Sequence, residues 1–166
     1  MNPEILSRIA ESCKIAWQMR KLARLISRIT RKFARQPAEA WLLCRMAWWV
    51  AVLSVAARVF SLPRALQIVA GNDTRTAPLR NANQEQLARA IDLLLSADVF
   101  VFKPICWKRA AVLRRYLLRN GIPTSIVFGV RNDNSGQVDG HAWLEAEGRP
   151  ILENSPPEYV VTYSFP

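Results

Sequence analysis

The sequence predicts an α+β protein, with helices in its N-terminal half and an antiparallel sheet in its C-terminal part. Up to about residue 120, apolar side chains recur every three or four positions, as in amphipathic helices. From Thr124 the pattern alternates with a period of two, and residues that favour turns separate the segments. Helices followed by strands are typical of α+β domains, and 166 residues suffice for one ordinary core.

Residues 1–37 predict a basic amphipathic helical extension. Nine of the 23 basic residues lie here, but only two of the 13 acidic residues. Apolar positions from Ile5 to Phe33 share one face. Such a helix can lie on an anionic membrane or against an acidic partner, and packing on the body with a solvated basic face is an equal alternative.

Residues 38–166 are predicted to form the main domain, which begins with a strongly apolar helix over residues 38–60. This helix carries Trp41, Trp48 and Trp49, and its uncharged part runs only from Met46 to Ala57. A membrane-spanning helix needs about 20 predominantly apolar residues. A buried core helix is therefore preferred, and peripheral membrane contact is the second choice.

Shorter helices and a meander of strands follow. Helices are predicted at residues 64–70, from residue 84 onward and at residues 106–120, and strands at residues 124–131, 138–145 and 149–153. A polar loop covers residues 71–83, and a polar turn covers residues 132–136. Asn83 with Gln86 predicts an N-terminal cap, and Gly121 predicts a C-terminal one.

Cys106 and His141 are the candidate reactive pair. His141 is the only histidine, so any Cys–His chemistry must use it. A thiol in the first turn of a helix lies at the positive end of the helix dipole, which favours the thiolate, and a nearby imidazolium acts in the same direction. The alternatives are a small buried cysteine and a structural histidine bonded to a backbone carbonyl.

The turn after the second strand determines which side chain stands opposite His141. A three-residue turn over residues 146–148 pairs His141 with Glu153, whose carboxylate would hold the imidazole. A turn one residue shorter would place Asn154 there instead. Pro150 favours the first register, because its missing donor then points away from the partner strand. Glu153 is the preferred third residue, and Asn154 is the reserve.

Several classes of function are disfavoured. Cys13, Cys44 and Cys106 include no close pair, which disfavours a disulfide framework and a zinc site. The first 35 residues hold charges throughout and show no signal peptide, so we expect the reducing cytoplasm. The net charge of +10 alone suggests nucleic-acid binding, but no recognised nucleic-acid-binding motif accompanies it.

The motifs around the reactive pair carry a family resemblance. They are Cys106-Trp-Lys-Arg-Ala-Ala-Val-Leu, Leu-Arg-Asn-Gly-Ile-Pro, Phe-Gly-Val-Arg and Gly-His141-Ala-Trp-Leu-Glu, with Glu153 twelve residues after the histidine. Over residues 104–154 the chain resembles the transglutaminase-like superfamily and, within it, the B-protein leader peptidase of lasso peptide biosynthesis. Residues 38–70 resemble that family loosely. Trp107 and Ala110 stand where the family commonly has Leu and Ser.

The resemblance implies a transglutaminase/papain-like core and a cysteine peptidase that removes the leader from a ribosomally made precursor peptide. Cys106 would attack the scissile carbonyl, His141 would carry the proton, and Glu153 would orient His141. The leader would be held by a separate recognition protein, because residues 1–70 show no strand-rich winged-helix segment. A macrolactam-forming cyclase would act next. No cofactor is expected: the family sometimes shows ATP-linked cleavage, but no nucleotide-binding motif is present.

Two other functions stay open at this point. The same triad could transfer the acyl group to an amine instead of water. Alternatively, the chain could be a non-catalytic module that binds a membrane or a partner through its basic helix and the tryptophans of residues 41–49. The expected location is accordingly cytoplasmic, with membrane association as an alternative.

Overall fold

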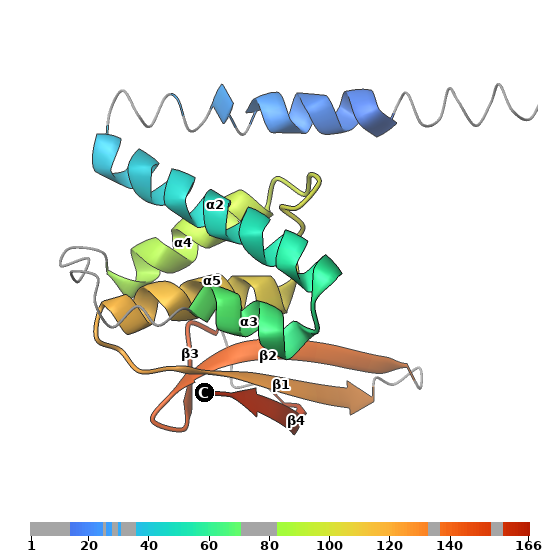
Figure 1. The fold of residues 1–166 in the computed structure, drawn as a ribbon, viewed down its shortest axis with the longest axis vertical. Coiled ribbons are helices and arrows are strands. Elements are labelled where there is room, and N and C mark those ends of the chain that lie inside the picture. The colour runs from blue at the N-terminus through green and yellow to red at the C-terminus, as the bar shows by residue number, and fades with distance from the viewer. Residues whose placement is uncertain are drawn as a thin grey trace, which may run out of the picture.

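The computed structural model describes residues 14–24, 26–27, 30, 36–70, 83–132, 137–153 and 158–166. Residues 14–24, 26–27 and 30 are helical. The other elements are α2 (Pro37–Val59), α3 (Leu62–Ala70), α4 (Gln84–Leu95), α5 (Cys106–Arg119), β1 (Ser125–Asn132), β2 (Val138–Ala146), β3 (Arg149–Ile151) and β4 (Val160–Phe165). The predicted α+β class, with helices in the N-terminal half, is confirmed (Figure 1).

Some features predicted from the sequence involve residues that the structure does not describe. Outside the described residues lie Cys13, Asn154, the remaining parts of the N-terminal helix, most of the loop at 71–83 and most of the turn at 132–136.

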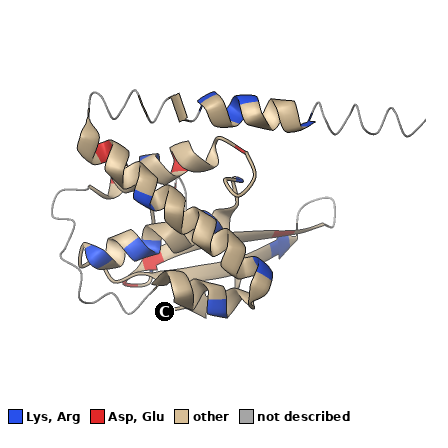
Figure 2. Cartoon of the chain, turned by 45° about the horizontal axis from the view of Figure 1, so that its top comes forward, with Lys and Arg blue, Asp and Glu red and all other residues tan. Residues whose placement is uncertain are grey.

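Within residues 14–24 the helix contacts the body at two points. Lys21 pairs with Asp98 at 3.4 Å, and the Phe100 N–H donates to Gln18 Oε1 at 3.1 Å. Lys and Arg residues occur on this segment and on the helices of the body (Figure 2).

Helix α5 lies at the centre of the molecule. It contacts β1 and β2 on one side and α2, α3 and α4 on the other, as Figure 1 shows. Its side chains Leu113, Tyr116 and Leu117 are fully buried. The first residue of α5 therefore has a position fixed by contacts with both the helical layer and the sheet.

Helix α2 buries one face and exposes the other. Leu43, Met46, Val50 and Leu53 are at most 2% exposed, as expected for a core helix. Among the described helices, α2 alone is long and apolar enough to cross a membrane, although core helices of soluble proteins pass the same test. Of its most apolar window, 39% is buried inside the molecule.

The predicted helix ends agree well with the structure. The Asn83 N–H donates to Gln86 Oε1 at 3.2 Å, which caps α4. Gly121 takes a left-handed φ of +78°, and the Ile122 N–H returns to the Leu117 carbonyl at 2.9 Å, which closes α5. Helix α3 begins before its predicted start and includes Pro63, because proline is tolerated in a first turn.

The sheet contains one strand more than predicted. Its order is β3-β2-β1-β4, and all neighbours are antiparallel. The predicted meander is β1-β2-β3, and β4 adds to the free edge of β1. Alternating β-branched and aromatic residues at 159–165 were the missed signal.

The preferred register of the β2–β3 hairpin was wrong. Glu145 pairs with Pro150 and Ala146 with Arg149, so the turn contains only Glu147 and Gly148. Both residues have positive φ, +51° and +72°, as a two-residue primed turn requires. Such a turn matches the strand twist, which explains why it wins over the longer one. Extrapolating this ladder would place Asn154 opposite His141, but β3 ends at Ile151.

Candidate functional site

Cys106 is the first residue of α5, at the end of an extended approach. Ile105 is the N-cap in an extended conformation, and its carbonyl accepts from the N–H groups of Lys108 and Arg109. The thiol is half-buried. It therefore lies at the positive end of the helix dipole, as the sequence predicts.

His141 lies in β2 and faces a carboxylate. Its Nε2 atom is 3.5 Å from Glu153 Oε2, which is an ion-pair distance and not a short hydrogen bond. The side chains are 29% and 19% exposed, so solvent reaches the pair from one side. Leu152 has a left-handed φ of +59°, which turns the chain after β3. Glu153 thus reaches His141 although the strand ladder does not pair the two residues.

Cys106, His141 and Glu153 line one cavity of about 280 Å³. The cavity is also lined by Asp92, Arg109, Ala142 and Leu152. Helices α4 and α5, strand β2 and the segment after β3 all contribute to its wall. Residues far apart in the sequence therefore line one cavity, and its wall includes a thiol, an imidazole and a carboxylate.

Arg109 joins three segments around this cavity. Its Nη1 donates to Glu153 Oε1 at 3.3 Å, and its Nη2 donates to the Leu152 carbonyl at 3.2 Å. Its Nε donates to Asp92 Oδ1 at 2.7 Å, and Nη2 also reaches Asp92 Oδ2 at 3.4 Å. Because Arg109 follows Cys106 by three positions, both lie on one face of α5.

Neither Arg109 nor Asp92 is among the residues predicted from the sequence to form the site. The available signal was the spacing of one helical turn between Cys106 and Arg109. Nothing in the sequence predicted that Asp92, from another helix, would hold the same guanidinium group. In the structure Glu153 is held at both oxygens, by Arg109 at one and by His141 at the other.

Two aromatic rings surround the His141 imidazole. Its ring centroid lies 6.1 Å from that of Trp143, at an interplanar angle of 17°, and 5.3 Å from that of Tyr159. The Trp143 indole N–H donates to Glu145 at 2.9 Å. Gly129 is the cross-strand partner of His141, and its lack of a side chain leaves space for both rings.

Tyr159 connects the ring cluster to a surface ion pair. Its hydroxyl donates to Asp139 Oδ2 at 2.8 Å, and Arg131 pairs with the same carboxylate at 3.1 Å. The hydrogen bond to Asp139 and desolvation raise the pKa of Tyr159, and the Arg131 charge opposes this rise. The phenol therefore remains a neutral donor.

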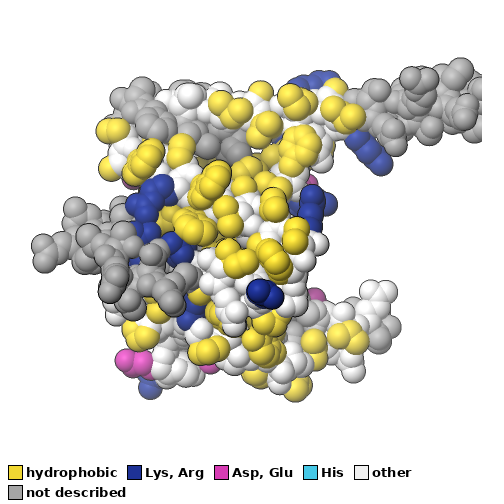
Figure 3. Space-filling model, viewed as in Figure 1, with side chains coloured by type: hydrophobic (Ala, Val, Ile, Leu, Met, Phe, Trp, Pro, Cys, Tyr) yellow, Lys and Arg dark blue, Asp and Glu magenta, His cyan; other side chains and the backbone are white. Residues whose placement is uncertain are grey.

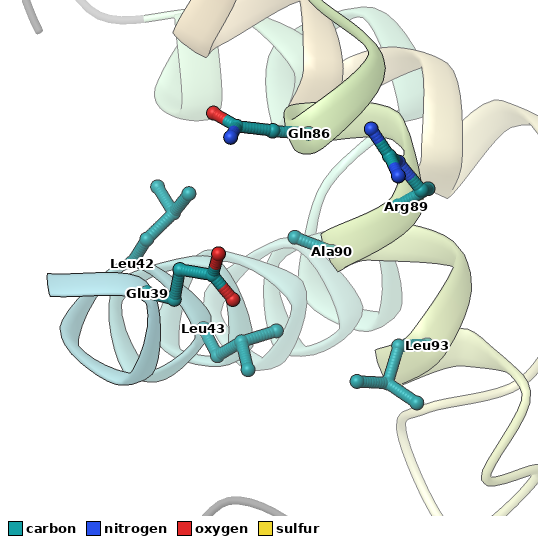
Figure 4. Close-up of a pocket in the computed structure, with 7 residues that line it drawn as sticks. All are labelled: Glu39, Leu42, Leu43, Gln86, Arg89, Ala90 and Leu93. Atoms are coloured by element: carbon teal, nitrogen blue, oxygen red, sulfur yellow. The ribbon is translucent and has the colours of Figure 1, made fainter. Parts of the chain in front are cut away.

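A second hollow, of about 210 Å³, lies between α2 and α4 (Figure 4). Glu39 and Leu43 line it from α2, and Gln86 and Arg89 line it from α4. Its described lining contains no cysteine, serine or histidine, so it offers no nucleophile. Nor do the described residues contain any group of three His, Cys, Asp or Glu side chains that could hold a metal ion.

A cysteine at a helix start, a histidine on an adjoining strand and a carboxylate behind it define the class of cysteine-dependent enzymes that act on acyl groups. Residues 49–164 match the transglutaminase-like superfamily, and the chain belongs to it. This superfamily includes cysteine peptidases and acyltransferases and is generally enzymatic. No curated protein and no solved structure matches the chain.

Proposed function

We propose that the protein is a cysteine peptidase that removes the leader from the precursor of a lasso peptide. The observation that carries this proposal is the shared cavity, in which Cys106, His141 and Glu153 meet and Glu153 lies 3.5 Å from His141. The motif resemblance around Cys106 and His141 supports the choice of a leader peptide as substrate. The substrate would be the precursor, a ribosomally made peptide.

In the proposed reaction, the Cys106 thiolate attacks the carbonyl carbon of the scissile peptide bond. His141 Nε2 faces Glu153, so Nδ1 is the nitrogen left to exchange a proton with the sulfur. The carbonyl π electrons move to its oxygen. The N–H groups of Cys106 and Trp107, which make no hydrogen bond with described residues, are suited to hold that oxyanion.

Collapse of the tetrahedral intermediate breaks the C–N bond. His141 gives its proton to the leaving amine, and a thioester between Cys106 and the leader remains. Water then attacks the thioester as His141 accepts a proton. The products are the free leader acid and the thiol, so the enzyme returns to its starting state. Glu153 stabilises the imidazolium in both steps, and Arg109 keeps Glu153 in place.

The same proposal assigns roles to the parts of this chain and to its partner proteins. Residues 38–166 would be the peptidase domain and residues 1–37 its extension. A separate protein would hold the leader, and a macrolactam-forming cyclase would receive the released core peptide. The reaction balances without a cofactor, because water is the only second substrate. The protein would work in the cytoplasm, either free or at the membrane surface.

Cleavage of the precursor peptide encoded beside the protein tests the proposal. The full chain is incubated with this precursor and the accompanying leader-binding protein, and the products are followed by mass spectrometry. We expect one cut that separates leader from core, and no cut with Cys106→Ala or His141→Ala. Equal cleavage by wild type and Cys106→Ala, or none by wild type, would overturn the proposal.

Acyl transfer on the same residues is distinguished in the same assay. With methylamine added, a hydrolase gives mainly the leader acid, whereas an acyltransferase gives mainly the methylamide, which is 13 Da heavier than the acid by roughly integer masses. Dominance of the amide at millimolar amine would replace hydrolysis by acyl transfer as the function. Because both routes share the thioester, Cys106→Ala abolishes either product.

A further inference from the structure

A cavity of about 460 Å³ lies between α2 and α5, and it shares no lining residue with the candidate active site. Its wall combines aromatic rings with positive charge. The residues concerned are Trp41, Trp48 and Trp49 with Arg45 from α2, and Arg115 and Arg119 from α5. Among the described residues, no acidic side chain lines the cavity. The proposed function uses none of these residues.

Two of the arginines in this cavity, Arg45 and Arg119, lack a counter-charge among the described residues. Arg119 is only 9% exposed, and its Nε atom is buried without a hydrogen-bond partner in the described part of the chain. Neither Arg45 nor Arg119 forms an ion pair with a described residue. A buried N–H of a charged group without a partner is costly, so an anion that enters the cavity would replace the lost hydration of the Arg119 Nε.

The guanidinium groups of the three arginines lie close enough to the buried Tyr116 hydroxyl to affect its pKa. Burial raises the pKa of the Tyr116 hydroxyl, and the charges of Arg45, Arg119 and Arg115 oppose that rise. Arg115 is held in place, because it donates to the Val69 carbonyl and its guanidinium lies 3.7 Å from the centre of the Trp49 ring. The cavity therefore has a fixed wall, and Arg45 and Arg119 supply the unpaired charge.

An exposed apolar row runs along α2 beside the cavity. Trp41 and Trp48 are 62% and 65% exposed, and Val55 and Val59 follow on the same face at 57% and 67%. Figure 3 shows hydrophobic side chains gathered over the face where α2 lies, with Lys and Arg at their border. The opposite face of α2 packs in the core, so this helix is suited to lie along an apolar surface rather than cross it.

We propose that the arginine–tryptophan cavity binds the phosphate of an anionic phospholipid at a membrane surface. Arginine matches phosphate oxygens with two parallel donors, and tryptophan prefers the headgroup level, where its ring is apolar and its N–H is wet. A soluble acidic peptide would satisfy the arginines but would leave the adjacent apolar row uncovered. The net charge of +10 attracts the whole chain to the same surface.

Vesicle flotation tests this assignment with the full chain. Vesicles of phosphatidylglycerol and phosphatidylcholine are compared with vesicles of phosphatidylcholine alone, at constant ionic strength. The variants are Arg45→Gln, Arg119→Gln and Trp48→Ala. Arg89→Gln is the matched control, because it removes the same charge from an exposed position on α4. Circular dichroism and thermal melting verify that each variant folds.

We expect binding that requires phosphatidylglycerol, a loss of about fivefold in affinity for Arg45→Gln, and no comparable loss for Arg89→Gln. Trp48→Ala should also weaken binding, which bulk charge does not explain. Arg45 and Trp48 are accessible to solvent, so Arg45→Gln and Trp48→Ala test the assignment even if Arg119→Gln does not fold. Equal weakening by Arg89→Gln, or equal binding to phosphatidylcholine vesicles, would overturn the assignment.

Two soluble competitors distinguish the lipid from other anions. Glycerol phosphate at millimolar concentration should not release the protein from vesicles, because it lacks the apolar part. Release at that concentration would mean that the cavity takes a free phosphate group. A polyglutamate peptide that binds the protein with the same dependence on Arg45 and Trp48, while vesicles do not, would also overturn the proposal.

Discussion

Substitution of Gly129 by alanine tests whether the ring cluster positions His141. Gly129 pairs with His141 across β1 and β2. A Cβ atom at Gly129 would lie 2.7 Å from Tyr159 Cβ and 2.9 Å from two ring carbons of Trp143. Ordinary carbon contacts are about 3.5–4.0 Å, so each neighbour must retreat by about 1 Å. Both neighbours contact the imidazole, which must therefore move with them.

The size of the effect follows from these contacts. Overpacking of this kind costs about 1–3 kcal/mol, and the loss of glycine freedom in the unfolded chain returns about 0.4–1 kcal/mol. We expect a net loss of about 1–2 kcal/mol in the free energy of unfolding. For a chain of this size, that corresponds to a melting temperature lower by about 2–8 °C. A shift of about 1 Å at His141 should lower kcat/KM by about 100-fold.

Gly140→Ala is the matched control for this experiment. Gly140 lies next to His141 in β2, and a Cβ atom there would meet nothing within 4 Å. We expect unchanged or slightly higher stability and nearly unchanged cleavage. Differential scanning calorimetry and the mass-spectrometric cleavage assay measure both variants. If Gly129→Ala behaves like Gly140→Ala in both assays, the ring cluster does not hold His141 and this reasoning is refuted.

Four other substitutions test the candidate site and the core. Glu153→Gln keeps the shape of the side chain but removes its charge, so kcat should fall by about 10²-fold or more with little change in melting temperature; unchanged kcat would exclude the orienting role. Arg109→Met should lower kcat by about 10–100-fold, because Glu153 would be misplaced. Asp92→Asn keeps one acceptor for Arg109 and should lower kcat less. A larger loss of kcat for Asp92→Asn than for Arg109→Met would contradict the positioning role of Arg109. Tyr116→Phe should raise the free energy of unfolding by about 1 kcal/mol, because the buried Tyr116 hydroxyl has no hydrogen-bond partner among the residues that the structure describes. A lower free energy of unfolding, measured by chemical denaturation, would show that the hydroxyl has a partner.

Local signals predicted the class of the fold and the placement of most elements. The capping pair Asn83–Gln86 and the cap at Gly121 determine where α4 begins and α5 ends, because such signals act through backbone groups close in sequence. The predicted reactive pair, Cys106 and His141, rested on equally local features. The structure places both on the wall of one cavity.

The hairpin register could not be derived from the same kind of signal. The sequence Ala146-Glu147-Gly148 fits a turn of two or three residues, and Glu147 must take a positive φ for the shorter one. The strain of this positive φ is small. It is offset because the two-residue turn matches the twist of the strands, and the sequence does not reveal that twist. Strand β4 differs, because the alternation at residues 159–165 is a local signal that was missed. Only its place beside β1, about 35 residues away in the sequence, depends on long-range pairing.

The two alternatives for the third residue rested on an assumption that the structure removes. Both required that the side chain opposite His141 be set by the strand ladder. The ladder ends at Ile151, and the left-handed φ of Leu152 redirects the chain. Glu153 then meets His141 because Arg109 binds both the Leu152 carbonyl and the Glu153 carboxylate. Since Arg109 follows Cys106 by one helical turn, a single helix positions the Cys106 thiol and, through this arginine, the carboxylate that faces His141.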